Sequence, residues 1–329
     1  MKNGKIVGTV KEVWRYPVKS MQGQKIPHSQ IAKFGVIGDR GWAVKDDDVG
    51  EIRGVRKLPK LLNYSAAYVT EPSATMIPPV RITHPTGELS DVIDTEHQAA
   101  MSEYLKKPVS LWPLQPKSNV GHYRLAEMAN SKDLRNQFGT DTNPDISSIS
   151  LKLLLELSVF ATPLGRYYDA YPLHLLTTAS LVEMANCEPK GDFDARRFRP
   201  NIVIDSGDDQ QGFVEFGWTG GVLAIGDTLI KCETRTVRCS MPAQPQPGLS
   251  KNAAVVKSLV ANTDRHLGIY ATVIREGRIK EGDDVVLYTP RLMKVKQALE
   301  PITNSIKRKL LDASLKAADY MSEKNSSNP

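Results

Sequence analysis

The chain has 329 residues, of which 40% are hydrophobic and 24% charged. This composition excludes a wholly disordered chain, and the length suits two domains because single cores stop growing at roughly 250 residues. The net charge of +6 is compatible with anionic ligands. The basic residues are scattered, however, and no RNA-binding or zinc-finger signature occurs, so we expect no nucleic-acid partner.

The cysteines are Cys187, Cys232 and Cys239, an odd number that is not typical of a disulfide scaffold. The first residues alternate apolar with polar side chains and lack the apolar core of a signal peptide. No later run reaches the roughly 20 apolar residues of a membrane span. We therefore predict a soluble, cytoplasmic protein without a transmembrane segment.

Residues 1–114 carry mostly strand signals, such as the run from residue 6 to residue 16, and predict a β-rich domain. A short helix is expected over residues 96–105, before the Lys107-Pro108 stop. Residues 115–165 are polar and turn-rich, and we interpret them as an insertion or covering flap, hereafter the insertion. Its one apolar segment, residues 150–160, is interrupted by Lys152 and Glu156, which favours a buried helix over a membrane anchor.

Residues 166–290 predict a second domain, with a helix over residues 177–187 and strands at 201–205, 220–234, 268–274 and 277–289. Because strands dominate and do not alternate regularly with helices, we expect an α+β, mainly β, fold. No dinucleotide-binding or Walker A motif occurs.

Residues 291–329 predict a C-terminal amphipathic helix with a disordered tail over 322–329. Pro301 is expected to start a second helix or to kink the first. We expect the apolar stripe to dock on the chain itself or on a second copy, giving a dimer, in preference to an acidic membrane surface. The stripe comprises Leu292, Val295, Leu299, Ile302, Ile306, Leu310 and Ala313.

Basic residues stand at three points where an anion could bind, although the first is, taken alone, more typical of a solvated loop. Lys19 and Ser20 follow a predicted strand and pair a point charge with a hydroxyl donor. Arg40 follows Asp39, a neighbour that is typical of a structural ion pair. The segment 194–204 crowds Arg196, Arg197 and Arg199 before an apolar strand, and arginine suits bidentate phosphate contacts.

Cys239 follows Arg238 and lies near Arg235. Cationic neighbours lower a thiol's pKa and favour the thiolate, which serves as a nucleophile or as a ligand for a soft metal. The alternative is an inert buried thiol. The six histidines show no zinc-binding pattern, although a distant Cys-His pair stays open.

Six stretches in order resemble the MOSC-domain proteins that carry an N-terminal MOSC β-barrel domain, a group that includes the molybdenum cofactor sulfurase C-terminal domain and the amidoxime-reducing components. The stretches are YPVKSM (16–21), GDRGWAV (38–44), VRKLPKL (55–61), RFRPNIVID (197–205), VRCSMPAQ (237–244) and GIYATVIREGRIKEGDDVVL (268–287). The resemblance covers about residues 5–290, with the insertion as a gap. It implies an N-terminal β-barrel-like domain followed by a MOSC β-barrel domain.

The resemblance further implies that a molybdenum cofactor, molybdopterin with molybdenum, lies between the domains with its metal bound by Cys239. The cofactor-binding residues implied by motif position, with the looser candidates at the helix start included, are Lys19, Ser20, Arg40, Thr177, Thr178, Ser180, Arg199, Asn201 and Arg238. Two departures bear on the substrate class. Val237 stands where amidoxime-reducing members are expected to have serine, and the following stretch is rich in Pro and Gln.

The resulting hypothesis is a molybdenum-dependent oxidoreductase that reduces small N-hydroxylated or N-oxygenated substrates. Its electrons would come from a separate iron–sulfur protein or a haem or flavin reductase, because the chain lacks a four-cysteine cluster set and a flavin motif. The alternative is a cofactor carrier or sulfur-transfer module with a persulfide on Cys239. A third interpretation is a degenerate site that binds another anion.

Overall fold

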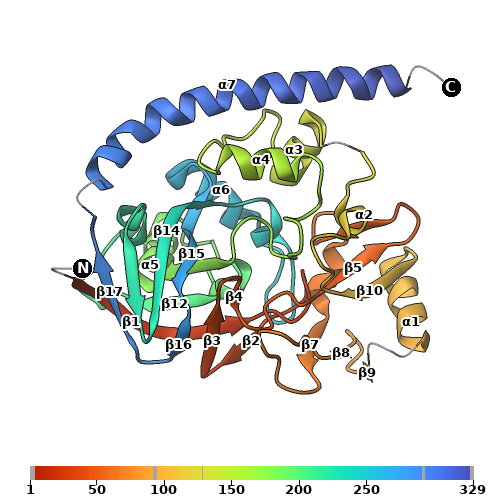
Figure 1. The fold of residues 1–329 in the computed structure, drawn as a ribbon, viewed down its shortest axis with the longest axis horizontal. Helices are drawn as coiled ribbons and strands as arrows, with labels where there is room; N and C mark the ends of the chain where they lie inside the picture. The colour runs from red at the N-terminus through yellow and green to blue at the C-terminus, as the bar shows by residue number, and fades with distance from the viewer. Residues whose placement is uncertain (1–3, 92–94, 128, 291–292, 327–329) are drawn as a thin grey trace.

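The computed structural model describes residues 4–91, 95–127, 129–290 and 293–326, and Figure 1 shows their arrangement. The strands are β1 Lys5–Arg15, β2 Gln24–Ile26, β3 His28–Ala32, β4 Gly35–Val36, β5 Trp42–Asp46, β6 Glu51–Arg53, β7 Ser65–Tyr68, β8 Val80–Thr83, β9 Leu89–Asp91, β10 Val109–Pro113, β11 Leu173–Thr177, β12 Ile202–Asp205, β13 Val222–Ile225, β14 Thr228–Val237, β15 His266–Arg275, β16 Gly277–Lys280 and β17 Asp284–Tyr288. The α-helices are α1 Thr95–Leu105, α2 Val120–Tyr123, α3 Ser131–Phe138, α4 Leu151–Leu157, α5 Thr178–Cys187, α6 Ala253–Thr263 and α7 Met293–Ser326. The 3-10 helices are η1 Pro59–Asn63, η2 Ala195–Arg197, η3 Val214–Trp218 and η4 Met241–Ala243.

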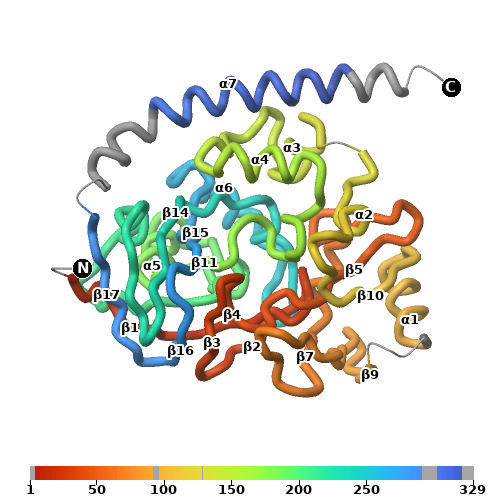
Figure 2. Tube along the Cα trace, in the orientation of Figure 1, coloured from red at the N-terminus to blue at the C-terminus, as the bar shows by residue number. Residues whose placement is uncertain are grey.

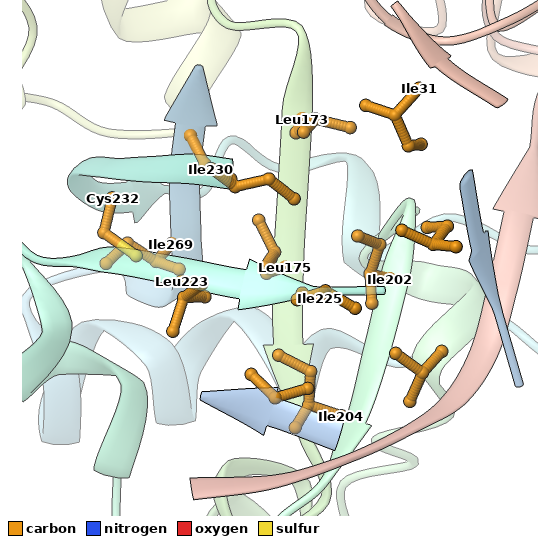
Figure 3. Close-up of a cluster of buried hydrophobic side chains, with 14 of the residues drawn as sticks. Ile31, Leu173, Leu175, Ile202, Ile204, Leu223, Ile225, Ile230, Cys232 and Ile269 are labelled. Carbon is orange, nitrogen blue, oxygen red and sulfur yellow. The ribbon is translucent and has the colours of Figure 1, made fainter. Parts of the chain in front are cut away.

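A closed barrel forms the larger core. Its strands follow the order β12-β11-β15-β14-β13-β17-β1, and pairing of β1 with β12 closes the ring, while β2 extends β1. Only β11 and β12 pair in parallel within the ring. Aliphatic side chains on alternate strand positions point inward and form a dry core, which Figure 3 shows around Leu175, Ile202 and Leu223.

The first strand of the chain thus belongs to the barrel built mainly from residues 173–288, so the two halves of the sequence share one sheet. The rest of the N-terminal half forms a second core between the sheets β10-β5-β6 and β7-β8-β9 and helix α1. A third small sheet, β16-β3-β4, covers the barrel and contributes Ile31 and Ile279 to its core. The predicted helix at 96–105 is confirmed as α1.

The insertion holds α2, α3 and α4 and packs through a separate apolar cluster that includes Phe138, Leu153 and Leu154. The predicted buried helix is confirmed as α4, which Ser150 caps by accepting a hydrogen bond from the backbone N–H of Leu153. Figure 2 shows α3 and α4 between the body of the protein and α7.

Helix α7 is a single helix that passes through Pro301 and continues to Ser326, so residues 322–326 are helical where a disordered tail was predicted. The helix docks on its own chain, as expected, but not through the predicted stripe. Leu315 and Ala318 are buried and Leu311 joins the cluster of the insertion, whereas Ile302, Ile306 and Leu310 are 48–60% exposed.

The error has a simple cause: α7 carries apolar side chains on two opposite faces, and periodicity alone does not choose between them. Leu292 and the side chains of Val295 and Leu299 lie outside the described part of the chain.

The predicted α+β class is confirmed, with a β-barrel, additional sheets and a C-terminal helix. Within the described residues, no helix is long and apolar enough to cross a membrane. The domain boundaries at residues 114, 165 and 290 stay a prediction.

Candidate functional site

A small cavity opens where loops from both halves of the chain meet beside the barrel. The residues that line it come from the turn before β5, the segment that leads into β11 and its first residues, the segment before β12, the segment from the end of β14 into η4, and β15. They are Arg40, Tyr168, Asp169, Tyr171, His174, Phe198, Arg199, Asn201, Arg238, Met241 and Tyr270. We call this the cationic cavity, because three arginines face it.

These arginines are withdrawn from solvent. Arg199 is 7% exposed, Arg238 is 8% exposed, and the side chain of Arg40 is 11% exposed. Burial and the charge of Arg40 lower the pKa of Arg199 to about 10. Arg40 forms an ion pair with the buried Asp39, whereas Arg199 and Arg238 form none with the described carboxylates. Buried charges without a counter-ion are costly, and these two arginines are therefore suited to an anionic ligand.

Backbone strain is concentrated at the same place. Among the described residues, six non-glycine residues have a positive φ, and they include Ser20 (71°), Arg40 (52°) and Arg199 (54°). Left-handed backbone costs a non-glycine residue about 1 kcal/mol or more. Three of the predicted site residues thus adopt a conformation that the surrounding fold must enforce.

Tyr16 links two of the cations. The guanidinium of Arg199 lies 4.1 Å from the centre of its ring, and that of Arg40 lies 5.1 Å from it. The hydroxyl of Tyr16 donates to the carbonyl oxygen of Pro200 at 3.1 Å, and its backbone N–H donates to Asp39 at 2.9 Å. The ring therefore holds both arginines in fixed positions through cation–π contacts.

Two nitrogens of these arginines have no acceptor. Nη1 of Arg199 donates to the carbonyl oxygen of Met21 and Nη2 of Arg238 donates to that of Phe198, but Nη2 of Arg199 and Nε of Arg238 are buried and unpartnered. Buried donors are nearly always satisfied in native proteins. These orphaned donors indicate a place for an oxyanion such as a phosphate.

Lys19, by contrast, already has partners. Its ammonium group donates to the carbonyl oxygen of Tyr167 at 3.0 Å and forms an ion pair with Asp169. Burial lowers the pKa of Lys19, and the Asp169 carboxylate opposes this effect. The surrounding protein disfavours the charged form of Asp169, yet Lys19, Arg40 and Arg199 outweigh this and lower its pKa to about 2.

Cys239 is a free, half-buried thiol between the cavity residues Arg238 and Met241. It packs on the cluster of the insertion, and the hydroxyl of Ser240 donates to the carbonyl oxygen of Gln137 in α3 at 3.1 Å. The insertion thus contacts the segment that carries the thiol.

The expected thiolate is not favoured in the ligand-free protein. Burial raises the pKa of Cys239, and it outweighs the opposing effects of the Met241 backbone N–H and Arg238. Arg235, expected to help, is exposed and lies over the ring of Phe216. A thiol with these properties loses its proton when a metal binds it.

Thr177, Thr178 and Ser180 do not line the cationic cavity. The hydroxyls of Thr177 and Ser180 donate to Oε2 of Glu215, at 2.7 and 2.6 Å, and the hydroxyl of Thr178 donates to Asp205 at 3.3 Å. They lie at or beyond the opposite end of β11 from His174, away from the cavity. Their hydroxyls donate to carboxylates within the fold instead.

Ser20 and Asn201 also have structural partners. The hydroxyl of Ser20 accepts a hydrogen bond from the backbone N–H of Val55 at 3.1 Å. Asn201 lines the cavity, yet its side-chain oxygen accepts from the backbone N–H of His174 at 3.1 Å. The structure brings Lys19, Arg40, Arg199, Asn201, Arg238 and Cys239 to one place and leaves the other predicted residues outside it.

Sequence reasoning missed the segment before β11, which contributes Tyr168, Asp169 and Tyr171 to the cavity. The signal was present, because three tyrosines and an aspartate within residues 167–171 are unusual in a loop. It also missed His174, whose pKa burial and Arg238 lower well below its usual value. His174 is therefore neutral near pH 7.

The donor set can be tested against a molybdenum cofactor. Within the described ranges no three His, Cys, Asp or Glu side chains gather to hold a bare metal ion. A cavity with aromatic walls and orphaned arginine donors, and a single thiol next to Arg238 in the chain, instead fits an anionic organic cofactor that brings its own metal ligands. The residues present fit the group.

Comparison with known proteins assigns the chain to a family. The model of the MOSC domain matches residues 165–286, and that of the MOSC N-terminal beta barrel domain matches residues 7–114. The mitochondrial amidoxime reducing component 2 of Rattus norvegicus is 24% identical, and the mitochondrial amidoxime-reducing component 1 of Homo sapiens is 25% identical. Each match covers 85% of this chain and 83% of the relative.

Among solved structures, the YuaD protein of Bacillus subtilis is 9% identical, with a TM-score of 0.44 over 88% of this chain and 100% of that one. The two domain matches together span more than half of the sequence in the order that the sequence motifs predicted. The chain belongs to the MOSC-domain family, in the form that carries an N-terminal MOSC β-barrel domain.

Proposed function

We propose that the chain binds a molybdenum cofactor in the cationic cavity and reduces N-hydroxylated or N-oxygenated substrates. The observation that carries the proposal is the pair of orphaned donors, Nη2 of Arg199 and Nε of Arg238, in a cavity lined by Arg238 and Met241, the chain neighbours of Cys239. The names of the relatives, amidoxime reducing components, support the substrate class.

The residues would divide the work as follows. Arg199 and Arg238 bind the phosphate of the pterin, and Tyr16 keeps Arg40 and Arg199 in position. Cys239 supplies the protein's ligand to the metal, and its raised pKa means that loading releases a proton. The bound cofactor supplies a metal that takes up and passes on electrons.

The reaction consumes two electrons and two protons for each N–O bond that breaks, and it releases the amine or amidine together with water. A separate protein delivers the electrons, because the three cysteines of this chain are too few and too dispersed for an iron–sulfur cluster. Asp169, with a pKa of about 2, stays charged and orients Lys19 instead of donating protons. Phe138 of the insertion and Val237 of β14 belong to the apolar cluster on which Cys239 packs, so the insertion helps to bury the thiol.

Metal analysis tests the proposal. Protein purified from a host that makes the cofactor is expected to contain about one molybdenum per chain, and Cys239→Ala is expected to lose it. Cys187→Ala, which removes an exposed thiol on α5, is the matched control and should keep the metal. Reduction of benzamidoxime with an artificial electron donor then tests the substrate class.

The alternative, a sulfur carrier with a persulfide on Cys239, predicts a mass increase of one sulfur atom on that residue without metal. Burial disfavours it, because the raised pKa of Cys239 reduces the thiolate that would accept sulfur. Absence of both molybdenum and pterin from the wild-type protein would contradict the cofactor proposal. Retention of molybdenum by Cys239→Ala would contradict the role of the thiol.

A further inference from the structure

Helix α7 has two apolar faces, and only one of them is covered. The inner face rests on the insertion: the backbone N–H of Ser131 donates to Asp319 at 2.9 Å, and Lys307 donates to the carbonyl oxygen of Ser147 at 3.2 Å. Leu315 and Ala318 are buried there. The contacts of this face hold α7 along the outer edge of the molecule, as Figure 1 shows.

The outer face carries an uncovered stripe. Ile302 is 60% exposed, Ile306 57%, Leu310 48% and Tyr320 67%. At 100° per residue these side chains fall within about 80° of one another, together with the exposed Ala313 and Ala317. We call these residues the outer stripe. Large apolar side chains in a row on one exposed surface mark an interaction site.

The charged residues beside the outer stripe indicate what kind of surface binds it. Lys309 and Lys316 are exposed and lie along one edge of the outer stripe, seven residues apart, so they project in nearly the same direction. Tyr320 lies at the C-terminal end of the stripe, and its ring combines an apolar body with a polar tip, as is typical of interfacial residues.

A second copy of the chain does not satisfy these lysines. In an antiparallel pair of α7 helices, Lys309 and Lys316 would face their own copies, and like charges across a helix pair are unfavourable. In a parallel pair they would face the opposite edge of the stripe, where Thr303 and Ser314 carry no charge. An anionic surface satisfies both lysines at once.

We propose that the outer stripe of α7 binds the surface of a membrane that contains anionic lipids, with the helix in the plane of the interface. The apolar side chains would enter the boundary between headgroups and acyl chains, and Lys309 and Lys316 would contact lipid phosphates. Because the inner face stays docked on the insertion, binding needs no rearrangement of the helix. The inference is independent of the cofactor.

Sedimentation of the full chain with vesicles tests this surface. The wild-type protein is expected to bind vesicles of phosphatidylcholine mixed with phosphatidylserine, to bind pure phosphatidylcholine at least about tenfold more weakly, and to lose affinity as salt rises. Ile306→Ser combined with Leu310→Ser should weaken binding roughly a hundredfold. Lys309→Ser combined with Lys316→Ser should weaken it about tenfold or more and reduce the salt dependence.

Val182→Ser is the matched control, because Val182 is 59% exposed on α5, away from α7. It should bind like the wild type, and unchanged melting temperatures should show that all variants are folded. Two results would overturn the proposal: a wild-type protein that does not sediment with either vesicle, or the Ile306 and Leu310 double variant binding as well as the wild type. A wild-type dimer in light scattering that the same double variant dissociates would assign the stripe to a second copy and also overturn it.

Discussion

Arg197 and Arg199 are two residues apart and both are buried, but they differ in the hydrogen-bond partners of their terminal nitrogens. Both terminal nitrogens of Arg197 are satisfied by the loop that follows Cys239: Nη1 donates to the carbonyl oxygens of Pro242 and Gln244 at 3.1 and 3.3 Å. Its Nη2 donates at 2.8 Å to the carbonyl oxygen of Ser250 and to the side chain of Asp192. Arg199 has one such bond and an orphaned Nη2. The Nε of Arg197 is also buried and without a partner, so the contrast between the two residues concerns their terminal nitrogens. The supply of partners at these terminal nitrogens, not burial or residue type, separates the two arginines.

Replacing Arg197 should have the largest effect on stability. Arg197→Met removes the donors of three loop carbonyls, of which that of Pro242 is buried, and leaves Asp192 without its ion pair, so the free energy of unfolding should fall by about 3 kcal/mol. Urea unfolding measures this change. Arg196→Met is the control, because Arg196 is exposed and pairs with the half-buried Asp194, and it should cost less than about 1 kcal/mol. An equal decrease in the free energy of unfolding in the two variants would contradict the structural role of Arg197.

Arg199→Met should do the opposite. The ligand-free variant should unfold with a free energy no lower than that of the wild type, because a buried and poorly paired cation is removed. Its affinity for the cofactor should fall about a hundredfold, as for the loss of a charge-assisted contact to phosphate. Pterin fluorescence and denaturant unfolding of ligand-free protein measure the two quantities. Lower stability with unchanged pterin content would show that Arg199 is a structural residue like Arg197.

The hydrogen bonds that connect Lys19, Tyr167 and His122 should stabilise the fold, as those of Arg197 do. His122, from the insertion, shares a 2.7 Å hydrogen bond with the hydroxyl of Tyr167, whose carbonyl oxygen accepts from Lys19. Burial, and to a lesser extent Lys45, lower the pKa of His122 to about 4. The unfolded chain therefore binds more protons than the folded one between about pH 6.5 and pH 4.

The free energy of unfolding should accordingly be fully retained above about pH 6.5 and fall by about 2 kcal/mol as the pH drops towards 4. His122→Gln should flatten this part of the profile, and His28→Gln, at an exposed position, should leave it unchanged. Urea unfolding across this range measures the slope. An identical slope in His122→Gln would place the acid sensitivity elsewhere.

The regular elements were predictable where the sequence has a clear period or a cap. The alternating strands of the barrel and helix α5, capped by Thr177, follow local rules. Helix α6 was missed, although Asn252 accepts a hydrogen bond from the N–H of Ala254 at its start. The docking face of α7 was wrong because two faces are apolar, and only the position of the insertion selects the inner one.

The candidate site was predictable only in part, for a different reason. Arg40, Arg199 and Cys239 stand in motifs, and their separate loops meet because β1 closes a barrel formed by the second half of the chain. Asp169 and its tyrosines lie in an irregular segment with no period to interpret. The raised pKa of Cys239 depends on burial by residues distant in sequence, which neighbouring arginines did not reveal.

The smallest expected effect concerns Asp169, a carboxylate that lines the cationic cavity. Asp169 neutralises Lys19 in the ligand-free protein, and with its side chain 79% exposed it also faces any anion that enters. Asp169→Asn removes this repulsion while Lys19 keeps the carbonyl of Tyr167, so the concentration of inorganic phosphate that gives a half-maximal rise in melting temperature should fall about tenfold.

Asp192→Asn removes the same charge next to Arg197, outside the cavity, and should leave the phosphate response unchanged. If Asp169→Asn instead weakens the response, then Lys19 requires its carboxylate partner to be held in place. Lys19 would then be a structural residue, as Arg197 is. The number of hydrogen-bond partners in the ligand-free protein would no longer identify the residues that bind the anion. A gain confined to Asp169→Asn would show that the cavity is tuned by a carboxylate that competes with the ligand for the same cation.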